Sequence, residues 1–196
     1  MSTTPPSDPL KDVPADIASV KGRIRNICGD LAMRIDEDGQ WYHEGAPIGR
    51  IELVRLFATV LKRDDHGNYW LATPVEAGRI QVDDAPFVAV EAIFGSSGDE
   101  PVVSFRSNLD DVVTLDDEHP LRISERPGVS GTEPEPRPYI HWRDGLEARI
   151  ARAVFYDLVA HAVEEQVGDE TFLGLWSAGT FFPLGKMPQE TLGNTA

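Results

Sequence analysis

The chain has 196 residues, of which 41% are hydrophobic and 26% are charged, so its composition is that of an ordinary globular protein and excludes a disordered chain or a fibrous repeat. The net charge of -15 disfavours binding to a nucleic-acid duplex or an anionic membrane, because both are polyanionic, and no window approaches the roughly 18 apolar residues that span a bilayer. A single cysteine, Cys28, and a start without the basic and then apolar pattern of a signal peptide predict a cytoplasmic protein.

The first half of the chain is predicted to be rich in strands, with one clear helix. Prolines and small polar residues in 1–14 predict a flexible tail, followed by a short helix at 15–27. The turn Asp38-Gly39 between apolar runs predicts a hairpin within 31–43. Apolar residues at three- and four-residue steps predict an amphipathic helix over 50–62. Predicted strands follow at 69–73, 79–82, 87–94, 102–106, 112–115 and 121–124.

The second half begins with a stretch rich in proline and glycine, 125–138, which predicts an extended surface loop. A strand at 139–142 precedes a helix over 146–163, whose apolar stripe contains Leu146, Ile150, Val154 and Leu158. Two short strands follow, at 172–177 and 181–184. This hairpin-rich spacing predicts an α+β protein with two small, mostly antiparallel domains, at 15–83 and 84–196, and argues against a doubly wound parallel sheet.

The predicted order of elements recurs. The first half reads strand, helix, strand, strand at 41–43, 50–62, 69–73 and 79–82, and the second half has the same order at 139–142, 146–163, 172–177 and 181–184. At an offset of 99 residues Arg50 falls on Arg149, Phe57 on Tyr156 and Val60 on Val159. Any two amphipathic helices share a period, so coincidence remains an alternative to duplication of a β-α-β-β unit. Two copies that pack together would form a cleft at their interface, where small ligands tend to bind.

Several segments resemble the bacterial family called domain of unknown function 1285. They are Trp41 to Ile48 (Trp-Tyr-His-Glu-Gly-Ala-Pro-Ile), Leu53 to Phe57, Tyr69 to Glu76, Asp84 to Phe87, His119 to Arg122, Pro138 to Ala148 and Ser177 to Gly185. The resemblance implies a core with a duplicated motif, a second half similar to a pleckstrin-homology fold, and a nucleotide-like ligand at the domain interface with a part in signal transduction. It carries no established activity and no agreed catalytic residues.

No group of residues forms a specific catalytic or metal motif. His43 and Glu44 are types used in acid–base catalysis, but neighbours on a strand point to opposite faces and cannot readily serve one reacting atom. Acidic clusters, such as the one that ends at His119, lack the ligand spacing of a calcium loop or a zinc site and are better explained as solvated turns. No phosphate-binding glycine motif, serine elbow or activated cysteine is present. We therefore predict no metal, no cofactor and no enzymatic activity.

The ligand site is predicted from residues at the junctions of the repeat. Of 18 Lys and Arg residues only four are lysines, which leaves 14 arginines, and guanidinium groups bind phosphate and carboxylate in bidentate geometry. Aromatic rings can stack on a base beside such arginines. The predicted ligand-binding residues are Trp41, His43, Arg50, Arg55, Glu76, His141 and Arg143. The alternative is that Trp41 belongs to the core and that Glu76 pairs structurally with an arginine.

These observations lead to one main hypothesis and two alternatives. The main hypothesis is a cytoplasmic ligand-binding or sensor protein that takes a small nucleotide-like anion between its two domains. The first alternative is a protein-interaction adaptor without a small-molecule ligand, which would dock a partner on a sheet edge or an apolar patch. The second is an unrecognised hydrolase, which requires His43, Glu76 and His141 to lie close together.

Overall fold

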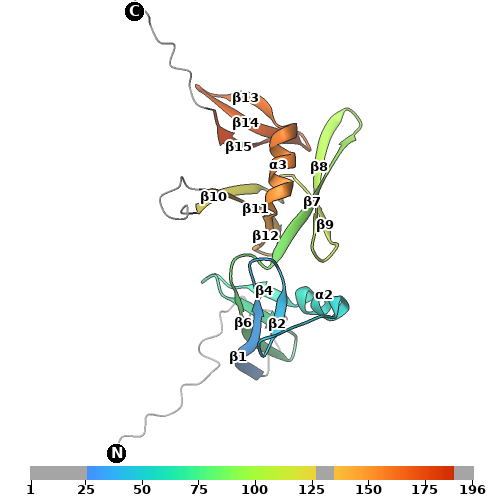
Figure 1. Ribbon diagram of the computed structural model, residues 1–196, viewed down its shortest axis with the longest axis vertical. Helices are drawn as coiled ribbons and strands as arrows, with labels where there is room; N and C mark the ends of the chain where they lie inside the picture. The colour runs from blue at the N-terminus through green and yellow to red at the C-terminus, as the bar shows by residue number, and fades with distance from the viewer. Residues whose placement is uncertain (1–25, 127–134, 188–196) are drawn as a thin grey trace, which may run out of the picture. The chain divides into compact units, whose positions relative to one another are not determined.

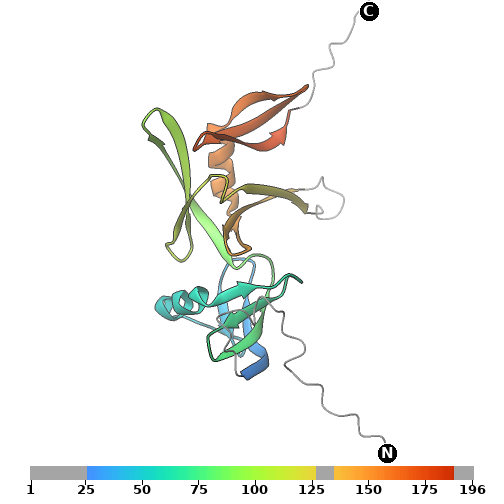
Figure 2. The same cartoon turned by 180° about the vertical axis from the view of Figure 1, so that it is seen from behind.

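The structure, a computed structural model, describes residues 26–126 and 135–187 (Figures 1 and 2). The predicted tail at 1–14 lies outside the described residues, as does most of the predicted helix at 15–27. The chain divides into two compact units. Among the described residues, the first contains 26–87 together with Arg143–Glu147, and the second contains 88–126, 135–142 and 148–187. The sequence had predicted a division between residues 83 and 84.

Within residues 26–87 and 143–147, the part that the structure describes, the first unit is a six-stranded sheet with one helix. Its elements are β1 (Asn26–Ile35), β2 (Trp41–His43), β3 (Ala46–Pro47), α2 (Ile51–Thr59), β4 (Leu61–Arg63), β5 (Tyr69–Ala72) and β6 (Glu76–Val82). The strand order is β3-β2-β1-β6-β5-β4, and all pairs are antiparallel except β1 with β6. Alternation along β1 buries Met33 and Ile35 and leaves Arg34 exposed, as expected for a sheet with one solvated face.

Two turns of the first unit use the same carboxylate arrangement. Asp36 and Asp64 each accept hydrogen bonds from the backbone N–H groups two and four residues further on, at 2.8 to 3.0 Å. Each also accepts a bond from the ring-bearing residue six positions on, the Tyr42 hydroxyl at 2.9 Å and the Trp70 indole at 2.8 Å. Burial raises the pKa of both carboxyls, but these hydrogen bonds lower it by more, so both pKa values lie below the ordinary range.

The described residues of the second unit form two sheets and one helix. Its elements are β7 (Phe87–Ser97), β8 (Glu100–Ser107), β9 (Val112–Thr114), β10 (Leu121–Arg126), β11 (Glu135–Arg143), β12 (Leu146–Ile150), α3 (Arg152–His161), β13 (Val163–Val167), β14 (Glu170–Ser177) and β15 (Thr180–Lys186). One sheet has the order β10-β11-β12-β7-β8-β9, and the other is the antiparallel meander β13-β14-β15 (Figure 1). Phe105, Leu115, Ile140 and Leu158 are fully buried in its core.

The predicted helix over 146–163 was wrong at both ends. Leu146, Ala148 and Ile150 are buried and the two residues between them are half-buried, which is the two-residue period of a strand, and these residues form β12. Asp144 and Gly145, with φ of 48° and 75°, close the hairpin between β11 and β12. The helix α3 begins only at Arg152 and ends at His161. Leu146 and Ile150 fit both periods, so the four-residue step alone was misleading.

Three other predicted boundaries were also wrong. The short helix at 15–27 cannot extend to its predicted end, because residues 26 and 27 belong to β1. The helix at 50–62 ends at Thr59, and the chain returns as β4. The loop at 125–138 has strands at both of its ends, since β10 runs to Arg126 and β11 starts at Glu135; residues 127–134 lie outside the described part. Within the described residues the protein therefore has two helices among mixed sheets, which is consistent with the α+β class.

Candidate functional site

The predicted ligand residues of the first unit are spread over different surroundings. Trp41 is fully buried, its ring is stacked on Phe57 at 6.1 Å, and its indole N–H has no partner among the described residues. Arg50 is exposed at the N-terminal end of α2, and Arg55 is half-buried on the same helix. Trp41 thus lies in the core, where its ring offers no free face for stacking on a ligand.

His43 and Glu76 lie near opposite ends of β1. His43 pairs with Met33, whereas Glu76 pairs with Asn26, seven residues earlier on the same strand. At about 3.3 Å per residue the two sites are roughly 20 Å apart along the strand, so one proton transfer cannot involve both. Glu76 lies beside the thiol of Cys28, with its Oε2 3.9 Å from Sγ.

Arg143 belongs to the first unit and acts on its helix. Its guanidinium donates a hydrogen bond of 2.6 Å to the carbonyl of Ala58 in the last turn of α2 and lies 5.2 Å from the Phe87 ring centre. The last turn of α2 has no basic residue of its own, so Arg143 supplies the positive charge that favours a helix C-terminus. A structural role therefore accounts for these two contacts of Arg143.

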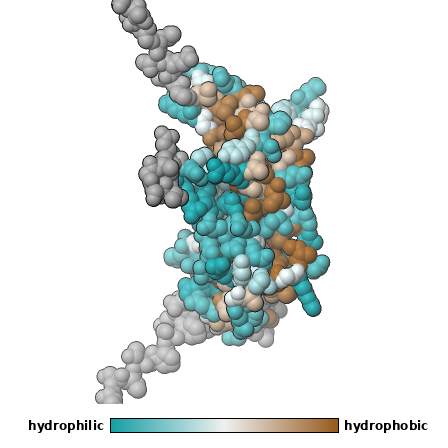
Figure 3. Space-filling model, viewed as in Figure 1, coloured by the Kyte–Doolittle hydropathy of each residue, from teal (hydrophilic) through white to brown (hydrophobic). Residues whose placement is uncertain are grey.

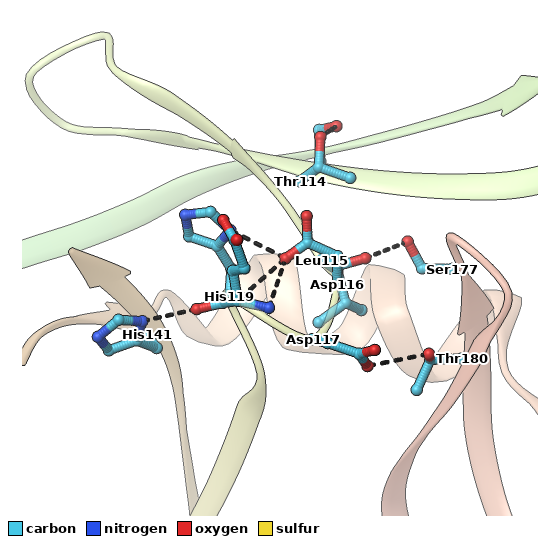
Figure 4. A network of polar contacts seen from close by, with 10 residues as sticks. Thr114, Leu115, Asp116, Asp117, His119, His141, Ser177 and Thr180 are labelled. Atoms are coloured by element: carbon cyan, nitrogen blue, oxygen red, sulfur yellow. Dashed lines mark hydrogen bonds and ion pairs between the residues drawn. The ribbon is translucent and has the colours of Figure 1, made fainter.

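His141 lies in a polar network of the second unit (Figure 4). Its Nδ1 donates to the carbonyl of Glu118 at 2.8 Å, and its ring centre is 6.3 Å from that of His119. His119 Nδ1 contacts the Asp116 carboxylate at 3.0 Å. Burial raises the pKa of Asp116, but hydrogen bonds from the His119 ring and from backbone N–H groups lower it by more, so the net pKa is below its usual range. The hydroxyl of Ser177 is fully buried and donates to the carbonyl of Leu115, so it is not an accessible nucleophile.

No described group of three or more His, Cys, Asp or Glu side chains is arranged to hold a metal ion. Neither of the two helices that the structure describes is long and apolar enough to cross a membrane.

A pocket of about 210 Å³ in the second unit gathers four arginines. It lies between the β10–β11 hairpin, the end of β12 and the first turn of α3, and its lining residues are Arg126, Glu135, Pro136, Arg137, Pro138, Arg149, Ile150, Arg152, Phe155 and Tyr156. The lining thus has four guanidinium groups and a single carboxylate. Arg137 Nε donates to the Tyr139 hydroxyl at 3.0 Å, and Arg152 Nε donates to the Tyr156 hydroxyl at 2.9 Å.

The start of α3 adds to the positive character of this pocket. Ala151 precedes the helix and makes no side-chain cap, and the first turn contains no acidic residue. The first N–H groups of a helix lack partners within it and carry partial positive charge. Burial of Ile150 and Pro138 gives the pocket an apolar floor, while Tyr156 is 56% exposed at its rim. We call these residues the arginine pocket.

A larger pocket of about 880 Å³ lies on the exposed face of the sheet in the first unit, and its charges are balanced. Its two arginines are ion-paired, Arg79 with Asp30 at 2.5 Å and Arg34 with Asp83 at 3.4 Å, and Glu44 adds a further carboxylate to the lining. Such a surface does not select for anions. None of the seven predicted ligand residues lines this pocket or the arginine pocket.

Family models match both halves of the chain. Residues 24–85 match the N-terminal domain of unknown function DUF1285, and residues 86–184 match the C-terminal domain of the protein of unknown function DUF1285. The chain belongs to the DUF1285 family. This confirms the resemblance found in the sequence. Among curated proteins, none matches the chain.

Two solved DUF1285 structures are similar to this chain. A family protein from Silicibacter pomeroyi DSS-3 is 41% identical, with a TM-score of 0.73 over 84% of this chain and 85% of the other. A family protein from Shewanella baltica OS155 is 22% identical, with a TM-score of 0.51 over 66% of this chain and 91% of the other, and shows similarity of fold alone. The arginine pocket of this DUF1285 protein lies within the residues matched by the C-terminal domain.

Sequence reasoning missed the arginine pocket. Its cationic residues come from three strands and a helix. The local sequence around each of them does not distinguish it from an ordinary surface arginine. One signal was present: Arg149 and Arg152 flank the start of α3, whose first turn lacks the acidic residue that helices favour there. The wrong start of the predicted helix concealed this signal.

Proposed function

We propose that this DUF1285 protein binds a small anionic ligand in the arginine pocket of its second unit. The observation that carries the proposal is the concentration of four guanidinium groups around one pocket of a protein whose net charge is -15. Like charges placed together repel, and an anion that accepts hydrogen bonds from several of them relieves this repulsion. The N–H groups of the first turn of α3, which have no partner within the helix and receive no side-chain cap from Ala151, act in the same direction.

The size of the pocket limits what it encloses. A volume of about 210 Å³ is smaller than the roughly 300 to 1,000 Å³ of pockets that enclose a whole drug-sized ligand. It suits a phosphate or carboxylate group whose remaining part extends over the rim. A nucleotide-like ligand would place its phosphate among the arginines and its base against the exposed ring of Tyr156. We propose a binding or sensor role in the cytoplasm, in signal transduction, rather than catalysis.

The test is a titration of the full chain with inorganic phosphate, phenyl phosphate, a nucleoside monophosphate and the matching uncharged nucleoside. A ligand at one hundred times its dissociation constant stabilises the protein by about 2.7 kcal/mol, which a thermal shift detects. Arg149→Gln and Arg152→Gln should each weaken phenyl phosphate binding by about ten- to a hundredfold, since hydrogen bonds to charged groups contribute about 1.5 to 3 kcal/mol. If none of the anions produced a thermal shift, the proposal would be refuted.

Arg106→Gln is the matched control for these variants. Arg106 belongs to the same unit and is ion-paired with Glu91 at 2.6 Å and with Asp110 at 3.0 Å, but it does not line the pocket. Its replacement removes one positive charge from the protein and should leave the affinity for phenyl phosphate unchanged within about twofold, because exposed charges are screened by salt.

A second candidate function is a protein-interaction adaptor. It is favoured by the exposed apolar side chains of α2, where Ile51, Leu53 and Leu56 are 39%, 37% and 61% exposed. On the face seen in Figure 3, apolar residues gather in separate patches among hydrophilic ones, and a partner could use one of them. Partner capture that is lost in Leu56→Ser and survives replacement of Arg50 and Arg143 would favour the adaptor.

We further propose that the two units contain a duplicated motif. After the hairpin β2–β3 the first unit continues with α2 and the strands β4, β5 and β6; after the hairpin β11–β12 the second continues with α3 and the strands β13, β14 and β15. The pairing differs, because β6 joins β1 in one sheet whereas β13–β15 form a sheet of their own. The likeness of the second unit to a pleckstrin-homology fold remains a prediction.

A further inference from the structure

Glu135 supplies the one carboxylate among the described lining residues of the arginine pocket. The register of β10 and β11 places it directly opposite Arg126. Its Oε2 lies 3.8 Å from a terminal guanidinium nitrogen of Arg152, at the first position of α3. The side chain of Glu135 is 64% exposed and that of Arg152 is 71% exposed, so neither is held by packing. A carboxylate therefore lies beside the guanidinium group of Arg152, one of the four that an anionic ligand would need.

We propose that Glu135 is an internal competitor for the anion site, which a ligand must displace before it can bind. This inference rests on the proposed function of the arginine pocket. A carboxylate and a phosphate both accept hydrogen bonds from the same guanidinium groups, so the two cannot hold the same donors. Because the pair with Arg152 is exposed, its displacement costs little, and Glu135 lowers the affinity for anions without closing the site.

The inference predicts the effect of removing the charge while keeping the shape. Exposed ion pairs of this kind are worth about 0.2 to 1 kcal/mol, so Glu135→Gln should bind phenyl phosphate about 1.4- to fivefold more tightly than the wild type. Glu164→Gln is the control for the change in net charge, because Glu164 is exposed on β13 and does not line the pocket. The affinity of Glu164→Gln for phenyl phosphate should equal that of the wild type.

Two probes of different charge separate displacement from simple repulsion. If Glu135 moves away when the ligand binds, Glu135→Gln should raise the affinities for the monoanion benzoate and the dianion phenyl phosphate by the same factor. The reason is that the same internal contact is broken in both cases. If Glu135 stays in place and repels the ligand, the energy scales with ligand charge, and the factor for phenyl phosphate is about the square of that for benzoate. That second result would overturn the inference.

The experiment is calorimetric titration of the full chain at pH 8 and low salt with benzoate and with phenyl phosphate. One outcome refutes only the role of Glu135: the wild type binds, Arg149→Gln binds more weakly, and Glu135→Gln binds no more tightly than the wild type. The residue then positions Arg152 instead of competing with the ligand. If neither the wild type nor Glu135→Gln binds either probe, the anion site itself is refuted and the competitor role with it.

Discussion

Replacing Asp64 by alanine should destabilise the first unit by about 3 kcal/mol. Asp64 is only 5% exposed and accepts a hydrogen bond of 2.8 Å from the buried indole of Trp70. Without the carboxylate this N–H has no acceptor, which costs about 1 to 3 kcal/mol. The backbone N–H groups of His66 and Asn68, now bonded at 2.9 and 2.8 Å, also lose their acceptor. These groups lie in a turn that water can reach, so each adds only about 0.5 to 1 kcal/mol.

The similar turn at Asp36 provides the comparison. Its carboxylate makes equivalent bonds, but its ring partner is the Tyr42 hydroxyl, and both Asp36 and Tyr42 are half-buried. Water can replace the lost acceptor there, so Asp36→Ala should cost only about 1 kcal/mol. Asp64→Asn keeps one carbonyl oxygen as an acceptor and should fall between the two alanine variants.

The assay is hydrogen exchange of the full chain, read on peptides that cover β4 and β5, with β14 and β15 of the second unit as the internal reference. Urea denaturation gives the same quantity: with a slope of about 1 to 3 kcal/mol per molar, a loss of about 3 kcal/mol lowers the midpoint of the first unit by about 1 to 3 M. Equal losses for Asp64→Ala and Asp36→Ala would refute the reasoning, because burial of the ring donor would then not decide the cost.

Three further predictions follow from burial, close packing and titration. Trp41→Ala should destabilise the first unit by about 3 to 5 kcal/mol, because Trp41 is fully buried. Trp176 is 40% exposed, so Trp176→Ala should destabilise the second unit by no more than about 1 kcal/mol. Similar losses of stability in calorimetry would contradict a core role for Trp41. Gly174→Ala should lower the melting temperature more than Gly78→Ala does. A Cβ at Gly174 would lie 2.5 Å from a backbone carbonyl oxygen, whereas a Cβ at Gly78 would meet a leucine side chain that can rotate. A larger loss for Gly78→Ala would show that the strands at Gly174 shift to make room. The folded pKa of Asp64 is lowered, so the unfolded state binds the proton more readily: the stability that Asp64 confers is present above about pH 4 and is lost as pH falls through the folded pKa. Urea midpoints between pH 3 and 7 should therefore fall less steeply with acid in Asp64→Asn than in the wild type, and parallel curves would contradict this.

Local patterns in the sequence located most of the strands. The strands near 69–73 and 79–82 were predicted close to their observed positions, because turn residues clearly separate the two segments from each other and from the preceding helix. The segment from Leu146 to Ile150 was assigned to the wrong element, since its apolar residues satisfy both the helical and the strand period. The deciding signal was the Asp144-Gly145 turn, whose two residues take the positive φ of a tight hairpin.

The candidate site was less accessible to sequence reasoning than the fold. Trp41 and Arg143 were expected to contact a ligand because of their residue types, yet Trp41 is buried in the core and Arg143 binds the end of α2. A residue type alone does not distinguish a side chain that serves the fold from one that serves a ligand. The arginine pocket depends on how β10, β11, β12 and α3 converge, which is a property of tertiary structure.

The geometry of the two proposed copies bears on where a ligand site arose. An offset of 100 residues places the turn Glu44-Gly45 on Asp144-Gly145, with φ of 50° and 81° against 48° and 75°, and places the buried residues of α2, Val54 and Ala58, on those of α3, Val154 and Leu158. The offset of 99 inferred from the sequence matched less buried positions instead, such as Tyr156, which is 56% exposed. Under the structural offset the counterpart of Arg149 is Gly49 and no longer Arg50, so the first copy lacks this arginine of the pocket. If the motif was duplicated, the proposed anion site, which uses Arg149, has no equivalent in the first copy.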